Sequence, residues 1–470
     1  MKIEQIYTGC LAEAAYYIES EGEAAIIDPL RETKPYTDRA KEDGATIKYV
    51  FETHFHADFV SGHLDLAAKT GATIVFGPTA QPGYEAYVAK DGEEFSVGKV
   101  KIRVLHTPGH TMESSSFLLL DEAGKETAIF TGDTLFIGDV GRPDLAIKTD
   151  LSREDLAGYL YDSLHTKIMT LPDDVIVYPG HGAGSACGKN MSKETSDTLG
   201  NQKRFNYALR AQSKEAFINE VTTGLVPPPQ YFPKNAVMNK LGYSAIDEVI
   251  QQGTQALSPA AFEAAANEVD ALILDVRDTQ NFAKGFISSA INIGLEGQFA
   301  GWVGTLIPDL NQPILLVAPE GKEEEAVLRL ARVGYDNCIG YLTGGFTAWQ
   351  ADGREVDTIP SITAETFATL FNQNPNLPVL DVRRKSEYDS EHIVGVENLP
   401  LDFINENMAR IDRTKTYYVH CAGGYRSMVA LSILKARGFT NLINVAGGFA
   451  AIKQTGKLPL TDYVCPTTLL

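Results

Sequence analysis

The stretch that decides the fold of the first part of the chain is Thr-His-Phe-His-Ala-Asp-Phe, residues 53–59. It follows the run Lys-Tyr-Val-Phe at 48–51, which is typical of a buried strand. His54, His56 and Asp58 then lie at positions i, i+2 and i+4 of the turn that ends this strand. Two imidazoles and a carboxylate at this spacing can converge on one ion. The stretch therefore predicts a metal site at a strand end.

Three further motifs of this kind follow, each just after an apolar run. His110 lies in Thr-Pro-Gly-His-Thr, Asp133 in Thr-Gly-Asp-Thr, and His181 in Tyr-Pro-Gly-His-Gly. A single His or Asp in a loop is usually structural, so none of them alone identifies a site. Four motifs in this order, all at strand ends, indicate one shared site.

Together the four motifs resemble the metallo-β-lactamase fold, in which successive strand ends deliver ligands to one edge of a β-sandwich. In dinuclear hydrolases of that superfamily, such as glyoxalase II, the first motif reads His-x-His-x-Asp-His, and its last Asp-His pair helps to hold a second zinc. Here the final position is Phe59, which has no lone pair to donate. We therefore expect a mononuclear site.

A mononuclear site shifts the resemblance to the persulfide dioxygenase branch of the superfamily, in which two His and one Asp hold a single iron. By that resemblance the ligands of one Fe(II) per chain are His54, His110 and Asp133. Such a set with open positions is typical of non-haem Fe(II) that activates O2. The remaining polar residues would orient ligands and water, and these are His56, Asp58 and His181.

Two other residues near these motifs are candidates for substrate binding. Arg142 closely follows the Asp133 motif and could hold the carboxylate or persulfide of a thiol substrate, whereas an exposed, solvated arginine is the alternative. Cys187 lies in Gly-Ser-Ala-Cys-Gly just after His181. By the same resemblance it could lie beside a substrate channel, and equally it could be a small loop residue.

Beyond about residue 255 the sequence repeats itself. Leu-Ile-Leu-Asp-Val-Arg at 272–277 is echoed by Pro-Val-Leu-Asp-Val-Arg at 378–383, and the Gly-Gly-Phe at 344–346 by that at 447–449. Each copy alternates short apolar strands with helical segments, which predicts a parallel sheet covered by helices on both faces. The motifs and their separation resemble rhodanese domains.

The expected fold class is therefore α/β: a metallo-β-lactamase αββα sandwich followed by two rhodanese-like α/β domains with parallel sheets. The run Pro-Pro-Pro at 227–229 cannot continue a helix and marks the end of the first domain. A length of 470 residues suits three domains of roughly 100 to 200 residues each. We expect the dioxygenase-like domain at 1–225, a linker or arm at 226–255, a thiol-less rhodanese-like domain at 256–357 and a catalytic one at 358–470.

The two rhodanese-like copies differ in their loops. In the second copy a strand at 417–420 runs into Cys-Ala-Gly-Gly-Tyr-Arg-Ser, which begins with Cys421 and contains Gly423, Gly424, Arg426 and Ser427. The matching loop of the first copy, 318–324, has no cysteine and carries acidic residues instead. Without a thiol the first copy cannot carry sulfane sulfur.

The chemistry of the second loop follows from its position between a strand and a helix. Backbone amides and the helix N-terminus favour negative charge there, so the nucleophilic thiolate of Cys421 is expected near neutral pH. Arg426 can pair with the oxygens of sulfite or thiosulfate. The loop closely resembles a rhodanese active site, in which the cysteine accepts sulfur as Cys-S-SH and the loop residues Gly423, Gly424 and Ser427 bind substrate. A buried structural cysteine is the alternative.

Composition excludes some classes of partner. A net charge of −20 and a pI near 4.9 argue against nucleic-acid binding, which needs a basic surface. No run reaches roughly 18 apolar residues, and the first residues lack the apolar core of a signal peptide, so we expect a cytoplasmic protein with no membrane partner. Five Cys without a CxxC pair suit a reducing compartment.

The whole pattern resembles persulfide dioxygenase–rhodanese fusions, which act in sulfide detoxification. The implied partners are a low-molecular-weight thiol persulfide, O2, sulfite and thiosulfate. The iron site would produce sulfite and free thiol, and Cys421 would transfer sulfur to that sulfite, giving thiosulfate. Two alternatives remain, a dinuclear zinc thioester hydrolase of glyoxalase II type and a non-oxidative sulfur-relay protein. The carrier thiol and the oligomeric state, a homo-oligomer included, stay open.

Overall fold

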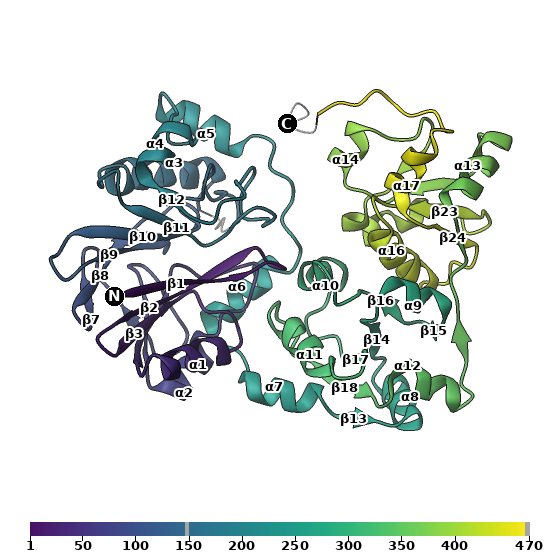
Figure 1. Ribbon diagram of the computed structural model, residues 1–470, viewed down its shortest axis with the longest axis horizontal. Helices are drawn as coiled ribbons and strands as arrows, with labels where there is room; N and C mark the ends of the chain where they lie inside the picture. The colour runs from purple at the N-terminus through teal and green to yellow at the C-terminus, as the bar shows by residue number, and fades with distance from the viewer. Residues whose placement is uncertain (146–149, 466–470) are drawn as a thin grey trace. The chain divides into compact units, whose positions relative to one another are not determined.

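A computed structural model describes residues 1–145 and 150–465 of the chain, which divides into two compact units (Figure 1). The first unit comprises residues 1–248 and the short segment 330–334, and the second comprises 249–329 and the chain from 335 onward. Residues 146–149 of the expected first domain and 466–470 of the expected last domain lie outside the described residues.

The first unit contains two six-stranded sheets. One sheet has the order β1 (Lys2–Thr8), β2 (Glu13–Ser20), β3 (Glu23–Ile27), β4 (Thr46–Glu52), β5 (Thr73–Phe76) and β6 (Tyr87–Val88). The other has the order β12 (Asp197–Thr198), β11 (Ile176–Pro179), β10 (Glu126–Gly132), β9 (Ser115–Leu120), β8 (Val100–His106) and β7 (Glu94–Val97). The strands β3, β4 and β5 run parallel, and so do β10 and β11, so several strands end at the same edge of each sheet.

Aromatic side chains fill the space between the two sheets. Tyr16 on β2 packs against Phe130 on β10 at 4.8 Å between ring centroids, and Phe51 on β4 packs against Phe117 on β9 at 4.9 Å. Each is buried, because alternate residues of a strand face the same side. This shared core fixes the strand ends of one sheet relative to those of the other.

Helices cover the outer faces of both sheets. Leu66 on α2 and Tyr36 on α1 join an apolar cluster with the first sheet, and Leu160 on α3 and Phe217 on α5 join one with the second. The helices of this unit are α1 (Lys34–Glu42), α2 (His63–Thr70), α3 (Arg153–Ser163), the π-helix η1 (Leu164–Ile168), α4 (Leu199–Phe205), α5 (Lys214–Thr222), α6 (Phe232–Leu241) and α7 (Ile246–Gly253), which reaches into the second unit. The layers are those of an αββα sandwich.

The segment 226–255, expected from the sequence to be a linker or arm, is partly integral to the first unit. It contains α6, whose buried Asn239 donates from Nδ2 to the carbonyls of His56 and Phe59, both at 2.7 Å. Its Oδ1 accepts the Ser61 N–H at 2.9 Å. The backbone carbonyls of His56 and Phe59 and the N–H of Ser61 are buried and need hydrogen-bond partners. Asn239 on the folded helix α6 supplies them, so this part of the segment cannot be a loose linker.

Asn239→Ala is expected to lower the free energy of unfolding of the first unit by about 2 kcal/mol or more, because two carbonyls and one N–H lose their partners. Chemical denaturation of the full chain would measure this. Asn219→Ala, on the exposed side of α5, is the matched control and should change it by less than about 0.5 kcal/mol. Equal stability of the two variants would show that α6 does not support the loop.

The second unit contains two five-stranded sheets with the same strand order, and every pairing between their strands is parallel. The first sheet consists of β13 (Ala256–Leu257), β18 (Cys338–Leu342), β17 (Ile314–Val317), β14 (Leu272–Asp275) and β16 (Ile291–Asn292). The second consists of β20 (Ser361–Ile362), β24 (Leu442–Val445), β23 (Tyr417–His420), β21 (Val379–Asp381) and β22 (Glu397–Asn398). A short antiparallel pair, β15 (Phe286–Ile287) and β19 (Val356–Asp357), accompanies the first copy.

Helices flank both parallel sheets. Those of the first copy are α8 (Pro259–Glu268), α9 (Thr279–Lys284), α10 (Phe299–Leu306), α11 (Glu323–Ala331) and α12 (Gly345–Ala351). Those of the second are α13 (Ala364–Gln373), α14 (Lys385–Ser390), η2 (Leu401–Phe403), α15 (Ile404–Asn407), η3 (Met408–Arg410), α16 (Tyr425–Ala436) and α17 (Gly448–Thr455). The predicted fold class, with its sandwich and two rhodanese-like parallel sheets, is confirmed.

The repeated Asp-Val-Arg and Gly-Gly-Phe motifs meet in space within each copy. In the second copy Arg383 donates to both oxygens of the buried Asp381, and its guanidinium lies 3.9 Å from the ring centroid of Phe449. The first copy has the same arrangement with Asp275, Arg277 and Phe346. These motifs therefore brace the strand end against the next helix, in both copies alike.

Among the described residues, no helix combines the length and the apolar character that crossing a membrane would require.

Candidate metal centre and candidate sulfur-transfer site

The three predicted metal ligands lie together in the first unit. His54 follows β4, His110 lies in the loop after β8, and Asp133 directly follows β10. One ligand atom from each lies within 4.8 Å of the others, and His110 Nε2 is 3.4 Å from Asp133 Oδ2. All three side chains are buried. The strand ends thus bring together residues that are up to 79 positions apart in the sequence (54 to 133).

The imidazole orientations suit a cation between these residues. His110 Nδ1 lies 2.9 Å from the carbonyl of Arg142, to which it can only donate, so Nε2 keeps its lone pair. Thr53 Oγ1 donates its proton to Asp28 at 2.8 Å and lies 3.0 Å from His54 Nδ1. The Thr53 oxygen can therefore only accept from Nδ1, which leaves the lone pair of His54 on Nε2. Burial lowers the pKa of His54 well below its ordinary value, which keeps the ring in its metal-binding, neutral form.

The carboxylate of Asp133 provides an independent test of the fit. Among the described residues neither of its oxygens has a hydrogen-bond partner, although both are buried. Nε2 of His110 and Nε2 of His181 lie 3.4 and 3.5 Å from its oxygens without forming a hydrogen bond. A buried carboxylate that accepts no hydrogen bond is costly, and a bound cation removes that cost. The residues present therefore fit one metal ion held by two imidazoles and a carboxylate.

Two glycines explain how the chain can approach the centre so closely. A Cβ atom on Gly180, which precedes His181, would lie 2.8 Å from Asp133 Oδ1. One on Gly141 would lie 1.9 Å from the Asp133 carbonyl and 3.1 Å from His110 Nδ1. Neither position has room for a side chain. Gly141 and Gly180, the glycine that precedes His181, are therefore both required for packing.

His56 points into a separate buried group. Its Nε2 lies 3.0 Å from Asp28 Oδ1 and 3.5 Å from Glu52 Oε2. Burial alone would lower the pKa of His56, but the nearby carboxylates outweigh burial and raise it to about 9. Sequence reasoning missed Glu52 and gave Asp28 no role. The one signal was that Asp28, like Asp133, directly follows a strand.

Phe59 occupies the position at which the resemblance to dinuclear hydrolases would place a further histidine. It is fully buried, and its ring centroid lies 4.3 Å from that of His56. An aromatic ring there supplies packing but no ligand atom.

Phe59→His is therefore expected to raise zinc occupancy toward two metals per chain in protein produced with added zinc. Metal analysis of the purified variant would measure it, with Phe59→Leu as the matched control that fills the space without a lone pair. Two metals per chain already in the unaltered protein would contradict the mononuclear interpretation.

Asp58, His181 and Cys187 form a second buried group beside the first. His181 Nε2 lies 3.3 Å from Asp58 Oδ2 and 3.5 Å from Asp133 Oδ1, so it connects the two groups. Burial, together with the charges of Asp58 and Asp133, raises the pKa of Cys187 well above its ordinary value. From the sequence, Cys187 could either lie beside a substrate channel or be a small loop residue. The structure places it buried next to Asp133.

The side chain of Arg142 is buried and forms several hydrogen bonds within the protein. It donates to both oxygens of Asp144, at 2.8 and 2.7 Å, and to the carbonyls of Ala186 and Val226. A substrate anion would have to share this guanidinium with Asp144. The alternative of an exposed, solvated arginine is wrong, since the side chain is 3% exposed.

The second unit contains the loop of Cys421, which follows β23 and lies at the start of α16. The buried Sγ accepts the N–H of Gly424 at 3.1 Å and lies 3.7 Å from Ser427 Oγ. Gly424 has a φ of +113°, a conformation that favours glycine. Ser427 also contacts Asn444 Oδ1 at 3.0 Å, which ties the loop to β24. Of the backbone amides predicted to surround the sulfur, that of Gly424 donates to it.

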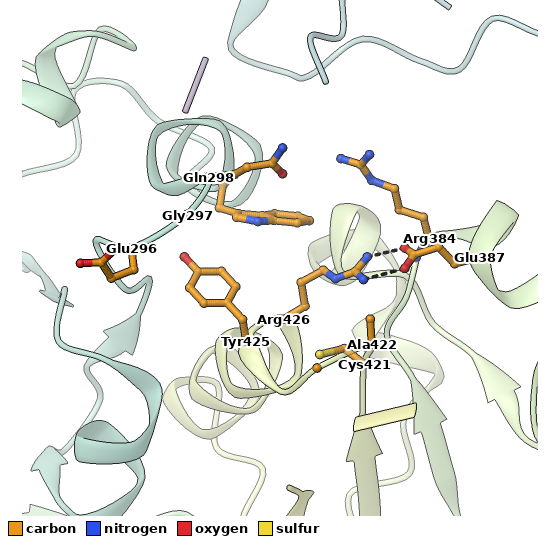
Figure 2. Close-up of a pocket in the computed structure, with 11 residues that line it drawn as sticks. Glu296, Gly297, Gln298, Arg384, Glu387, Cys421, Ala422, Tyr425 and Arg426 are labelled. Atoms are coloured by element: carbon orange, nitrogen blue, oxygen red, sulfur yellow. Dashed lines mark hydrogen bonds and ion pairs between the residues drawn. The ribbon is translucent and has the colours of Figure 1, made fainter. Parts of the chain in front are cut away.

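A cavity of about 650 Å³ lies over this sulfur (Figure 2). Gly423 and Arg426 line it, as predicted residues of the loop. Arg426, however, forms two hydrogen bonds with Glu387 on α14, at 2.5 and 2.8 Å. Burial alone would raise the pKa of Glu387, but Arg426 holds it below its ordinary value, so the pair is ionic. Sequence reasoning missed Glu387, because nothing in α14 marks it as close to the loop.

The same cavity is lined by residues of the first, thiol-less copy. They precede or belong to α10 and are Glu296, Gly297, Gln298 and Trp302. Arg384, Ala422 and Tyr425 of the second copy also line the cavity, and sequence reasoning gave none of them a role.

Comparison with known families agrees with this architecture. The model of the metallo-beta-lactamase superfamily matches residues 8–181, and the model of the rhodanese-like domain matches twice, at 258–352 and 363–455. A crystal structure of a metallo-beta-lactamase from Staphylococcus aureus is 33% identical, covers 73% of this chain and 98% of its own, and has a TM-score of 0.64. The chain belongs to the metallo-β-lactamase superfamily and carries two rhodanese-like domains after its metallo-β-lactamase domain.

Two curated relatives match part of the chain. The hydroxyacylglutathione hydrolase of Brucella anthropi is 41% identical over 145 residues, which are 30% of this chain and 50% of that enzyme. The mitochondrial persulfide dioxygenase ETHE1 of Homo sapiens is 34% identical over 161 residues, 34% of this chain and 59% of that enzyme. The matches thus span between half and three fifths of these relatives, which have different activities.

Proposed function

We propose that the chain is a persulfide dioxygenase with a sulfurtransferase domain, acting in sulfide detoxification in the cytoplasm. The first domain would oxidise a low-molecular-weight thiol persulfide with O2 to sulfite and thiol. The Cys421 domain would transfer a second sulfane sulfur to that sulfite, giving thiosulfate. The observation that carries the proposal is the group of His54, His110 and Asp133, with Phe59 where a further ligand would stand.

In the first domain the three grouped residues would hold one Fe(II) per chain, which when bound supplies O2 activation. The remaining work falls to the protein. The Arg142 carbonyl holds the His110 ring through Nδ1, and Thr53 does the same for His54. His181 and Asp58 would orient water and substrate, and burial of the whole group would exclude bulk water from the reaction.

In the second unit the roles follow from the loop geometry. The Gly424 N–H would stabilise the Cys421 thiolate and, after transfer, the persulfide. The thiolate attacks the outer sulfur of R–S–SH, the S–S bond breaks, and R–S⁻ leaves with the bonding electrons. The sulfur lone pair of sulfite then attacks the outer sulfur of Cys421–S–SH, which releases thiosulfate and restores the thiolate.

A second candidate function is supported by a specific observation. The 41% identity to a hydroxyacylglutathione hydrolase, together with the Asp58, His181 and Cys187 group, favours a dinuclear thioester hydrolase. Phe59 counts against it, since the position offers no ligand.

One paired assay separates the two candidates. Oxygen uptake with glutathione persulfide and thioester hydrolysis with S-lactoylglutathione would be measured on the same purified protein, together with its iron and zinc content. The proposal expects oxygen uptake with about one iron per chain and negligible hydrolysis. Hydrolysis without oxygen uptake would establish the second candidate instead.

A further inference from the structure

The cavity over Cys421 is larger than an inorganic sulfur donor needs. Its volume of about 650 Å³ falls within the roughly 300 to 1,000 Å³ of pockets that hold drug-sized organic molecules. A water molecule takes up about 30 Å³ in the liquid, and thiosulfate, with five heavy atoms, fills the space of only a few waters. An organic body attached to the donor sulfur would fill the remaining space.

The wall opposite the Cys421 loop is supplied by the thiol-less copy. Figure 2 shows Glu296, Gly297 and Gln298 on the ribbon that faces α16 across the cavity. Direct hydrogen bonds hold this wall in place within the second unit. Tyr425 Oη donates to the Gly294 carbonyl at 2.9 Å, just before the wall residues.

A second contact fixes the same two elements further along. The Asn292 N–H, at the end of β16, donates to Ser432 Oγ on α16 at 2.8 Å, and both residues are buried. These two hydrogen bonds therefore hold the wall at a fixed distance from α16, the helix that begins beside Cys421.

The wall offers groups suited to an organic molecule. The indole of Trp302 supplies an apolar face, and Gln298 supplies an amide whose side chain does not cap its own helix. Within the part of the chain that the structure describes, no hydrogen bond involves the Trp302 indole or the Gln298 side chain. Aromatic rings bury a large area at low entropic cost, and free amides bind amides or carboxylates of a ligand.

The charges favour the same type of donor. Arg426 is neutralised by Glu387, and Glu296 adds a negative charge to the lining. Arg384 faces the cavity with Asp402 at 3.6 Å. A doubly charged inorganic donor thus meets little uncompensated positive charge, whereas an organic persulfide carries less charge near its reacting sulfur.

We infer that the thiol-less domain selects the sulfur donor: Trp302 and Gln298 bind the organic body of a low-molecular-weight thiol persulfide while its outer sulfur reaches Cys421. This inference rests on the proposed sulfur transfer, and it gives the central domain a substrate-binding role in place of that of a spacer. The transfer itself is the balanced exchange given above, with R–S⁻ as the leaving group.

Donor kinetics of the full chain test the selection. With cyanide as the common acceptor and uncatalysed rates subtracted, Trp302→Ala should raise KM for glutathione persulfide about tenfold. The kcat/KM with thiosulfate should change by less than about twofold, and Trp302→Phe should recover most of the persulfide affinity. An equal fall with both donors, or no change with either, would overturn the inference.

A binding measurement removes the dependence on turnover. The chain has two tryptophans, and Trp349 is engaged elsewhere, donating from Nε1 to the Glu355 carbonyl at 2.8 Å. In Trp349→Phe the unreactive S-methylglutathione should quench the remaining tryptophan fluorescence saturably. In Trp302→Phe, the matched control, it should not. No quenching in the first variant, or equal quenching in both, would overturn the inference.

The same samples separate this inference from the proposed function. Mass spectrometry after exposure to glutathione persulfide reports whether Cys421 gains a sulfur. A Cys421 persulfide without Trp302 quenching would refute donor selection and leave the transfer intact. Quenching without a Cys421 persulfide would support the binding wall and refute the transfer.

Discussion

Asp133→Ala is expected to empty the metal centre and abolish oxygen uptake with glutathione persulfide. The reason is that its two buried oxygens accept no hydrogen bond among the described residues and face the imidazoles of His110 and His181, so they are free to act as ligand atoms. Metal analysis and an oxygen electrode, applied to one preparation, would measure both effects. The variant should still form thiosulfate from persulfide and added sulfite, because Cys421 lies in the other unit.

His56→Ala is the matched control for this prediction. His56 contacts Asp28 and Glu52, and it lies in a different group from the three ligands. Its loss should reduce activity by roughly 10 to 100-fold while most of the metal remains. If His56→Ala empties the centre and Asp133→Ala does not, the ligand assignment is wrong.

Cys421→Ser is expected to abolish thiosulfate formation and leave oxygen uptake nearly unchanged. Serine preserves the size of the side chain but is a very poor sulfur acceptor. Sulfite should therefore accumulate where the unaltered chain, given excess persulfide, accumulates thiosulfate. Chromatographic measurement of both anions would follow the change.

Cys338→Ser is the control thiol for that experiment. Cys338 lies on β18 of the first copy, outside the loop 318–324 that lacks a cysteine, and burial raises its pKa to about 12, so it should not take part. Thiosulfate formation at the normal rate in Cys421→Ser would refute the transferase assignment. Cys187 would then be the next thiol to replace.

The sequence predicted those parts of the molecule that depend on local patterns. Strand-end motifs led to the candidate residues, because strands that run in the same direction end at one edge of a sheet, and the resemblance to persulfide dioxygenases selected His54, His110 and Asp133 from among them. The repeat of Asp-Val-Arg and Gly-Gly-Phe led to the prediction of two parallel sheets. The motifs recur because their residues contact one another, as Arg383 contacts Asp381 and Phe449 in the second copy.

The residues that sequence reasoning missed act through tertiary contacts. Asn239 lies 180 positions from Phe59, to whose carbonyl it donates, within a segment expected to be a linker. Glu387 reaches Arg426 from another helix, and Trp302 reaches the Cys421 cavity from the other copy. No spacing in a single sequence marks such partners, because their proximity depends on how the elements pack.

The most direct test of the account is the ratio of O2 consumed to thiosulfate formed by the unaltered chain with excess glutathione persulfide. Oxidation of one persulfide yields one sulfite, and transfer of one further sulfur yields one thiosulfate, so we expect one O2 per thiosulfate and almost no free sulfite. Thiosulfate formed in anaerobic solution without added sulfite, or thiol released without oxygen uptake, would contradict the account.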